Sequence, residues 1–541
     1  MARTWRPGPR VFRRPSVMAI AAVRNDSARL HCALYEWDMW MPRAILPLSP
    51  KESRSFRRAI LVAAGFLAAL LVVSGPARAE AGPAELKQLV DSYAANRDFN
   101  GVVLVAQHGR ILYRGAHGLA NREWQVPNVG EGVFRIGSLT KPITAILVMQ
   151  LVEENRLRLE GTLGDYLPAL YANTPAASVT VAQLLNHTSG VADLPRSYED
   201  PWWNTQARLS FDPEDFAKAW IPGTLVSAPG AEWRYNNNGY FLLGLVIEKV
   251  TGASYEANLR GRILDRAGMK DSGLYHANDL IPRLATGYQT RPDLSLARPM
   301  PIDPSVSFAA AGLYSTVDDL LRLDRALQGD VLLAKHSRQA MWTDHRSNYG
   351  YGWEVENLTL PAGGTYKVES HTGSVPGYQS YWLRAEHDRS VVIILDNYWQ
   401  GETVATLGKE LMAVLHGEPI ALARKSLGNL LIPLATSQGV AGMTRAYEGL
   451  GAAASEYDTS EKALNSLGYR LLRMKRVPEA VTVFQWNASA HPESANVYDS
   501  LGEAHRANGD RDQAIRSYKK AAELAPSDTR IPGILKALEN R

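Results

Sequence analysis

The sequence predicts an α+β domain built on one antiparallel sheet, followed by an all-α tail of helical repeats. β-rich segments at residues 101–114 and 391–395 enclose a long region of helical and loop sequence, which is typical of a single sheet flanked by helices. Beyond residue 461, similar residues recur 34 positions apart, which is typical of a repeat protein. The 541 residues are 45% apolar and 21% charged, which excludes collagen-like, coiled-coil and wholly disordered chains.

Residues 1–79 are predicted to be an over-long N-terminus that ends in a signal peptide. Arg57 and Arg58 precede an uncharged apolar run over 59–73, and the small-residue sequence Ala-Arg-Ala ends at Ala79, as at a signal cleavage site. The run is shorter than the roughly 20 residues that span a bilayer. We therefore expect an exported protein, periplasmic or secreted, with no stable membrane span in the mature chain. Sec export and twin-arginine export both remain open.

The charge balance and the position of the single cysteine argue against several classes of function. Residues 1–79 hold 13 Lys and Arg against 4 Asp and Glu, whereas the rest of the chain holds 46 against 51. This balance gives no support for nucleic-acid binding. The only cysteine, Cys32, precedes the predicted cleavage site, so the mature chain has no disulfide, thiolate nucleophile or Cys-ligated metal. The histidines do not have the spacing of a metal-binding motif, and no glycine-rich nucleotide-binding motif stands at a strand-to-helix turn. We therefore expect neither a metal ion nor a cofactor.

Residues 80–419 are predicted to form the α+β domain. Its first strands are expected at 101–106 and 111–114, joined by a hairpin turn, and a buried strand is expected at 391–395. Helices are expected at 139–155 and 240–250, where apolar residues dominate.

Residues 461–541 are predicted to form tetratricopeptide-like repeats with a capping helix at 531–541. Small residues, aromatic residues and prolines recur 34 positions apart: Leu467-Gly468 with Leu501-Gly502, Ala480 with Ala514, Phe484 with Tyr518, and Pro492 with Pro526. Small residues let paired helices approach, and prolines end helices. Residues 420–460 are either a linker or a degenerate first repeat. The tail either binds a protein partner or packs on the preceding domain.

A serine and a lysine at the start of an apolar helix are the first candidate catalytic pair. Ser138 and Lys141 are three residues apart, so a helix places both side chains on one face. A serine needs a base to become a nucleophile, and a lysine can be that base only where its pKa is lowered. Lowering the pKa from about 10.4 to about 7 costs roughly 4 to 5 kcal/mol, which a buried site must supply.

Two further motifs follow in order along the chain. Tyr235 and Asn237 stand immediately before the apolar helix, and His371-Thr372-Gly373-Ser374 precedes the strand at 391–395. With Ser138 and Lys141, these resemble the S-x-x-K, Y-x-N and K-T-G motifs of penicillin-recognising serine hydrolases. The runs at 184–190, 311–316 and 349–353 are similar to the class C β-lactamase, esterase and D-aminopeptidase branch of that family. The resemblance covers about residues 85–415 and implies an antiparallel sheet flanked by helices plus a helical subdomain.

The resemblance also implies a role for each residue. Ser138 would attack an acyl carbonyl of a small-molecule or peptide substrate, and Lys141 would take its proton. Tyr235 would relay a proton to the leaving group or activate the deacylating water. Asn237 would hold Lys141 and the substrate amide. The backbone N–H groups of Ser138 and Ser374 would form the oxyanion hole.

His371 departs from the pattern of β-lactamases and transpeptidases, which place a lysine at this position. A histidine with an ordinary pKa is mostly neutral at pH 7, so we expect weaker recognition of a substrate carboxylate. With Thr372 and Gly373 beside it, His371 is expected to be part of the substrate-binding strand. The residue resembles the esterase and D-aminopeptidase members, which favours an ester or amide hydrolase. A true β-lactamase and a non-catalytic sensor with a partner-binding tail remain the alternatives.

A further histidine and four aromatic residues lie near the motifs. His187 is expected to pack and cap a loop. The aromatic residues Trp202, Trp203, Trp233 and Tyr378 lie near motif-bearing segments and are candidates to line an acyl pocket.

Two other segments match the Y-x-N and S-x-x-K patterns but are not expected to be catalytic. Tyr171 with Asn173 lies too close to the serine helix to be the Y-x-N motif. A second S-x-x-K match, Ser517 with Lys520, falls on a polar helix face of the repeat region and is expected on the surface.

Overall fold

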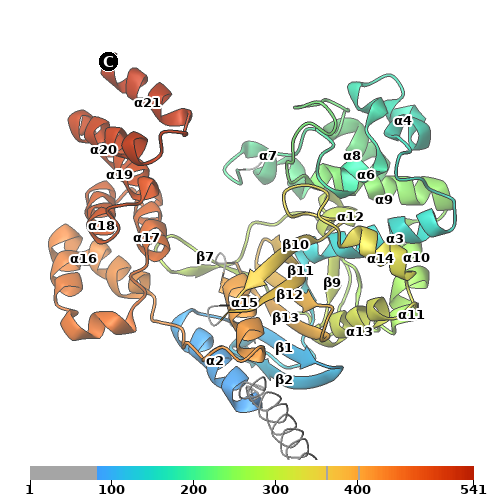
Figure 1. Ribbon diagram of the computed structural model, residues 1–541, viewed down its shortest axis with the longest axis horizontal. Helices are drawn as coiled ribbons and strands as arrows, with labels where there is room; N and C mark the ends of the chain where they lie inside the picture. Colours follow the sequence, from blue (N-terminus) through green and yellow to red (C-terminus); the bar gives the residue numbers. More distant parts are fainter. Residues whose placement is uncertain (1–81, 196, 361–362, 400–402, 541) are drawn as a thin grey trace, which may run out of the picture. The chain divides into compact units, whose positions relative to one another are not determined.

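The computed structural model describes residues 82–195, 197–360, 363–399 and 403–540 (Figure 1). The predicted signal peptide at 1–79 lies outside these residues. In the part that is described, no helix is both long enough and apolar enough to cross a membrane.

A six-stranded antiparallel sheet forms the centre of the first domain (Figure 1). Its strands, in spatial order, are β10 (Glu354–Thr359), β11 (Thr365–Val375), β12 (Tyr378–Ala385), β13 (Ser390–Asp396), β1 (Gly101–Gln107) and β2 (Arg110–Ala116). The predicted hairpin and the predicted strand at 391–395 are confirmed as β1, β2 and β13. The two ends of the domain meet in this sheet, where Val103 of β1 is paired with Ile394 of β13.

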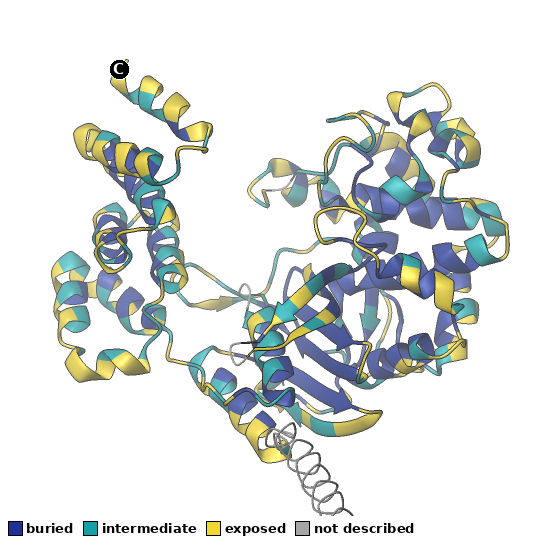
Figure 2. Cartoon of the chain, viewed as in Figure 1, coloured by how far each residue is buried: buried dark blue, intermediate teal, exposed yellow. Residues whose placement is uncertain are grey.

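Both faces of the central strands are buried, which explains why their sequences are continuously apolar. Val102 and Leu104 face the large core beneath the helical region, whereas Val103 and Val105 face a second core. That second core is covered by α2 (Pro83–Asn96) and α15 (Thr403–Leu415). Figure 2 shows the inner strands as buried, while the outer hairpin strand β2 is partly exposed. The predicted α+β class is confirmed.

The remaining helices and short strands lie between β2 and β10 or follow β13. The helices are α3 (Thr140–Glu153), α4 (Leu163–Tyr166), α5 (Pro168–Tyr171), α6 (Val181–Leu185), α7 (Pro201–Asn204), α8 (Pro213–Trp220), α9 (Asn237–Thr251), α10 (Tyr255–Leu259), α11 (Asp265–Ala267), α12 (Phe308–Ala311), α13 (Val317–Gln328) and α14 (Lys335–Met341). Single turns are η1 (Gly137–Leu139), η2 (Pro175–Ser178), η3 (Gln206–Arg208), η4 (Arg260–Leu264) and η5 (Pro304–Val306). The short strands are β3 (Leu119–Asn121), β4 (Val126–Pro127), β5 (Phe134–Arg135), β6 (Gly273–Leu274), β7 (Tyr288–Thr290), β8 (Leu296–Ala297), β9 (Leu313–Ser315) and β14 (Tyr398–Trp399).

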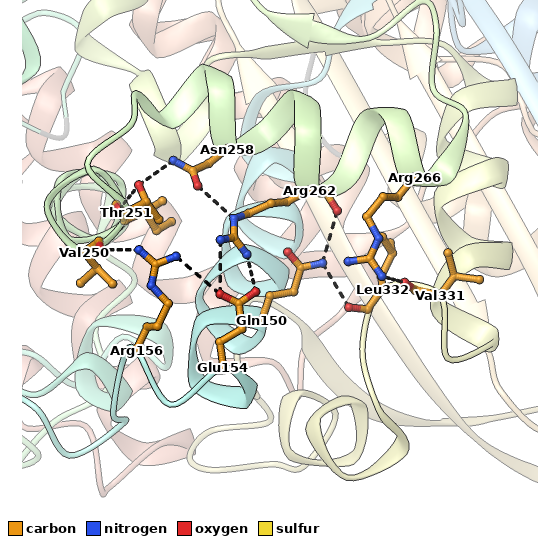
Figure 3. A network of polar contacts seen from close by, with 11 residues as sticks. Gln150, Glu154, Arg156, Val250, Thr251, Asn258, Arg262, Arg266, Val331 and Leu332 are labelled. Carbon is orange, nitrogen blue, oxygen red and sulfur yellow. Dashed lines mark hydrogen bonds and ion pairs between the residues drawn. The ribbon is translucent and has the colours of Figure 1, made fainter.

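Polar contacts anchor the C-terminal end of α3, the helix that begins beside Ser138 (Figure 3). Arg262 donates two hydrogen bonds to the Glu154 carboxylate, of 2.6 and 3.3 Å, and one to Asn258 Oδ1 at 3.1 Å. Gln150 donates to the main-chain oxygen of Leu332 at 3.1 Å. A bidentate arginine–carboxylate pair fixes both distance and orientation, so α3 is held at the end opposite to the serine.

The tail consists of α16 (Leu427–Glu448), η6 (Gly451–Glu456), α17 (Glu461–Arg473), α18 (Val477–Ala490), α19 (Ala495–Asn508), α20 (Arg511–Leu524) and α21 (Arg530–Glu539). The repeated glycines lie against the repeated aromatic rings. A Cβ atom added to Gly468 would lie 2.5 Å from the Phe484 ring, and one added to Gly502 would lie 3.0 Å from the Tyr518 ring. The 34-residue period therefore reflects helix pairs that pack too closely for larger residues.

Candidate active site

Ser138 lies in the η1 turn, which joins β5 to α3 and packs against β11. Gly137 has a φ of 53°, and a Cβ atom added there would lie 2.7 Å from the Ser374 nitrogen. Glycine adopts positive φ without the steric cost that a side chain brings. The turn therefore brings the serine main chain directly against the strand that carries residues 371–374.

Lys141 is fully buried, and its ammonium group has three neighbours at hydrogen-bonding distance. Nζ lies 2.9 Å from Ser138 Oγ, 2.8 Å from Asn237 Oδ1 and 3.1 Å from the main-chain oxygen of Ala310. Burial lowers the pKa of Lys141 to about 7, although Asp193 opposes this shift. The neutral amine is therefore well populated near neutral pH.

The three neighbours differ in what they can donate, and this difference limits how the hydrogen bonds around Lys141 can be arranged. The Asn237 amide oxygen and the Ala310 carbonyl only accept hydrogen bonds, whereas the Ser138 hydroxyl can also donate. A neutral lysine has two N–H donors and one lone pair. If Asn237 and Ala310 take the two donors, the lone pair faces Ser138. The geometry is thus suited to removal of the hydroxyl proton by Lys141.

Tyr235 approaches Ser138 from the loop that precedes α9. Its hydroxyl donates to Ser138 Oγ at 2.8 Å, and burial raises the pKa of the phenol, so the phenol is protonated at neutral pH. The next residue, Asn236, caps α9 by accepting from the Gly239 N–H at 2.7 Å. This cap fixes the point at which the loop enters the helix.

His187 packs against Tyr235. Its ring centroid is 4.4 Å from that of Tyr235, and its Nδ1 accepts a hydrogen bond from the Asn236 N–H at 3.1 Å. The side chain is buried, and this burial lowers its pKa well below the usual value. A neutral, packed histidine in this place supports the Tyr235 loop, in line with the expectation that it packs and caps.

Residues 371–374 lie on β11, where successive side chains alternate between its two faces. Thr372 and Ser374 are exposed and line the cavity beside Ser138, whereas His371 and Gly373 are buried. A Cβ atom added to Gly373 would lie 2.1 Å from the Ile136 oxygen, so glycine is required for close packing there. The Ser374 hydroxyl accepts a hydrogen bond from Trp399 Nε1 at 2.8 Å.

The His371 side chain lies on the buried face of β11, away from the cavity beside Ser138. It is 1% exposed and does not line the cavity. Its Nδ1 lies 2.6 Å from the Thr372 carbonyl oxygen and its Nε2 lies 2.9 Å from the Tyr349 hydroxyl. The carbonyl only accepts, so Nδ1 carries the proton and Nε2 accepts from Tyr349. Burial, with a smaller effect of Lys141, lowers the pKa of His371 to about 3, and the ring is neutral.

A cavity of about 440 Å³ opens beside Ser138. Of the four aromatic candidates, Trp203 and Trp233 line it, whereas Trp202 and Tyr378 belong to the buried core. The lining also includes residues that the sequence did not single out, notably Arg135, Tyr198, Asn238, Phe241, Ile302, Val306, Glu354 and Trp399.

Arg135 and Glu354 place a guanidinium and a carboxyl group on the wall of this cavity. The Arg135 guanidinium lies 4.6 Å from the centroid of the Tyr275 ring, and its buried Nε has no hydrogen-bond partner within the described chain. Burial lowers its pKa, although Tyr378, Tyr275 and Asp303 oppose the shift. Burial also raises the pKa of Glu354. Arg135 stands three residues before Ser138. That proximity was the one feature of the sequence that could have indicated its place at the site.

The competing motif matches have other roles. Tyr171 donates its hydroxyl to the Ile221 carbonyl at 2.9 Å in the helical region. Lys520 is exposed and pairs with Glu523 at 3.4 Å, as expected. Ser517 was expected on the surface, but the structure buries it in helix α20 of the tail.

Comparison with known proteins identifies two segments of the chain. Residues 86–416 match the family described as Beta-lactamase, and residues 495–528 match the tetratricopeptide repeat. Penicillin-binding protein 4* of Bacillus subtilis (strain 168) is 29% identical over 353 residues, which cover 62% of this chain and 76% of that protein. Esterase EstB of Burkholderia gladioli is 29% identical over 370 residues, which cover 59% of this chain and 91% of the esterase.

A solved structure supports the same assignment. The penicillin-binding protein from Bacillus halodurans is 28% identical, with a TM-score of 0.52, and the match covers 61% of this chain and 98% of that chain. The resemblance predicted from the three motifs and from the 34-residue period is therefore confirmed.

Proposed function

This chain belongs to the β-lactamase family of serine hydrolases, and from that premise we propose that it cleaves an ester or amide through an acyl-enzyme on Ser138. The observation that carries the proposal is the environment of Lys141. Its buried amine lies between Ser138 Oγ and two groups that only accept hydrogen bonds. This arrangement supports Lys141 as the general base and Ser138 as the nucleophile.

The proposed reaction uses these groups in turn. Lys141 takes the Ser138 proton as Oγ attacks the acyl carbon, and the N–H groups of Ser138 and Ser374 stabilise the resulting oxyanion. Tyr235 passes its hydroxyl proton to the leaving alcohol or amine, and the proton held by Lys141 replaces it. Water then attacks the acyl-enzyme with the same groups in the reverse roles. Asn237 keeps the Lys141 amine oriented, and the reaction needs no cofactor.

The substrate is proposed to be a small molecule or peptide with an apolar or aromatic acyl portion. Trp203, Trp233 and Phe241 supply the apolar wall of the cavity. His371 is neutral and buried, so it does not supply the cation that a carboxylate-bearing substrate needs. Arg135 carries a positive charge on the cavity wall, and we assign recognition of an anionic substrate group to it.

A β-lactamase is the second candidate function, and Arg135 is the observation that favours it, because a β-lactam carries a carboxylate. The non-catalytic sensor is less well supported, because the base and the tyrosine each lie within hydrogen-bonding distance of the nucleophile. The predicted signal peptide supports export. The match of residues 495–528 to a tetratricopeptide repeat supports a protein partner for the tail.

Hydrolysis of a p-nitrophenyl ester and of a chromogenic cephalosporin, measured in parallel, tests the proposal. Ester turnover is expected in the native protein and is expected to vanish in Ser138→Ala, while circular dichroism shows an unchanged fold. Rapid cephalosporin turnover would favour the β-lactamase. Unchanged ester turnover in Ser138→Ala would overturn the assignment of the nucleophile.

A further inference from the structure

Two histidines and an aspartate converge at a place that the catalytic proposal does not use. His387 and Asp388 lie in the turn between β12 and β13, and His416 directly follows α15. One ligand atom from each of the three residues can be chosen so that all lie within 4.8 Å of one another. His387 and Asp388 are adjacent in the sequence, whereas His416 lies 28 positions after Asp388. This spacing matches no common metal-binding motif, so only the folded chain brings the three residues together.

His416 has both of its ring nitrogens next to groups that only accept hydrogen bonds. Nδ1 lies 2.8 Å from the Met412 carbonyl oxygen, and Nε2 lies 3.0 Å from Asp388 Oδ2. A neutral imidazole has one N–H donor. If Nδ1 donates to the carbonyl, the Nε2 lone pair points at a carboxylate, and a cation must lie between them. A second proton or a metal ion can be that cation.

The surroundings hold these groups in the way that metal ligands are commonly held. The hydrogen bond from Nδ1 to a main-chain carbonyl leaves Nε2 as the ligand atom, an arrangement typical of metal-bound histidines. Asp388 accepts hydrogen bonds from Gln107 Nε2 at 2.9 Å and from the Ser390 hydroxyl at 2.7 Å. These contacts orient the carboxylate before any ion binds.

An aromatic ring packs against both histidines. The Tyr366 ring centroid lies 4.2 Å from that of His416 and 5.1 Å from that of His387. The His387 side chain is 47% exposed, whereas those of His416 and Asp388 are 7% and 12% exposed. The cluster is thus partly enclosed and remains open to solvent on the His387 side.

We propose that His387, Asp388 and His416 bind one Zn²⁺ or a similar divalent transition-metal ion, with water as the fourth ligand. Zinc bonds to nitrogen and oxygen are about 2.0 to 2.2 Å long, which places ligand atoms of a tetrahedral site about 3.3 Å apart. The distance from His416 Nε2 to Asp388 Oδ2 is 3.0 Å, and that from His387 Nε2 to Asp388 Oδ1 is 3.8 Å. These distances run to the two different oxygens of the Asp388 carboxylate, and one ligand atom of each residue can be chosen within 4.8 Å of the others. Rotation of the exposed His387 side chain is what brings both Nε2 atoms and one carboxylate oxygen to this geometry.

The ion has a stabilising role and not a catalytic one. It joins the β12–β13 turn to the end of α15, a helix that covers one face of the sheet. None of the three residues lines the cavity beside Ser138. Binding of the ion to the folded chain alone is therefore expected to raise the melting temperature and to leave the serine chemistry intact.

Zinc titration of the chelator-treated full chain, followed by calorimetry, tests this proposal. One ion is expected to bind with a dissociation constant in the micromolar range or below, and Co²⁺ in its place is expected to give a visible absorption band of tetrahedral intensity. His387→Ala and His416→Gln are each expected to weaken binding at least tenfold. His387 is exposed, so its variant retains the fold even where the His416 variant does not.

The matched control is His276→Ala, because His276 is an exposed histidine that also lies beside a carboxylate, that of Glu256, at 3.2 Å. This variant is expected to bind zinc as tightly as the native chain. Chelator treatment is expected to lower the melting temperature while ester hydrolysis at 25 °C remains. No binding at millimolar Zn²⁺, or equal binding by the native chain and both cluster variants, would show that His416 is simply protonated beside Asp388.

Discussion

The replacement Lys141→Met tests whether burial lowers the pKa of this lysine. The pKa falls from 10.5 in the unfolded chain to about 7 in the folded protein, which corresponds to a free-energy cost of about 4 to 5 kcal/mol. Below pH 7 the lysine is charged in both states, so the folded protein bears the full cost. As the pH rises from 7 towards 10.5, the folded protein holds a neutral amine while the unfolded chain still binds the proton. The cost is therefore progressively lost across this window.

Methionine removes the titration from this position. The stability gained by Lys141→Met, relative to the native protein, is therefore expected to be about 3 kcal/mol smaller at pH 9.5 than at pH 6. The loss of hydrogen bonds to Asn237 and Ala310 adds a constant that does not depend on pH and cancels in this comparison. Urea unfolding of both proteins at the two pH values, followed by tryptophan fluorescence, measures the difference.

Lys249→Met is the matched control, because Lys249 is exposed on α9, and its substitution is expected to show no such pH dependence. The native kcat/KM for an ester is expected to rise with pH through a pKa near 7, and Lys141→Met is expected to lose at least a hundredfold in activity. An equal stability difference at pH 6 and pH 9.5 would refute the argument that burial keeps this amine neutral.

Three further substitutions examine the groups around Ser138. Gly137→Ala places a Cβ atom 2.7 Å from the Ser374 nitrogen at a φ of 53° and is expected to lower kcat for the ester about a hundredfold or more by displacing an oxyanion donor; a native rate would contradict that role. Tyr235→Phe removes the hydroxyl and keeps the ring, so kcat is expected to fall at least a hundredfold with little change in melting temperature, and a native kcat would exclude proton relay. Arg135→Gln is expected to raise KM at least tenfold for an acyl substrate that carries a carboxylate, with a much smaller change for a neutral ester; equal changes for both would argue against anion recognition.

Local sequence patterns were sufficient to predict the main elements of the fold. The five consecutive apolar residues at 391–395 predicted a buried strand, and the structure shows why, since α2 and α15 cover one face and the larger core covers the other. The recurrence of Gly468 and Gly502 predicted paired helices, because only a small residue fits against the ring of the neighbouring helix. Both features depend on residues close in sequence or on a repeated spacing.

The placement of individual side chains around the site depended on tertiary structure. The motif at 371–374 predicted a strand at the site, but strand periodicity alone cannot say which face of that strand meets the cavity. Packing against η1 turns Thr372 and Ser374 towards Ser138 and leaves His371 buried beside Tyr349. The burial of Ser517 likewise could not be predicted from its local sequence.

The sequence by itself determined the residue types, their order and the local elements that carry them: a serine and a lysine one helical turn apart, a tyrosine before a helix, and a glycine-containing strand. The tertiary structure decided which groups share an environment. It buried Lys141 and so lowered its pKa to about 7, placed Arg135 on the cavity wall, and brought His416 to Asp388. Burial and long-range proximity arise from the packing of distant segments, which no local pattern of residues specifies.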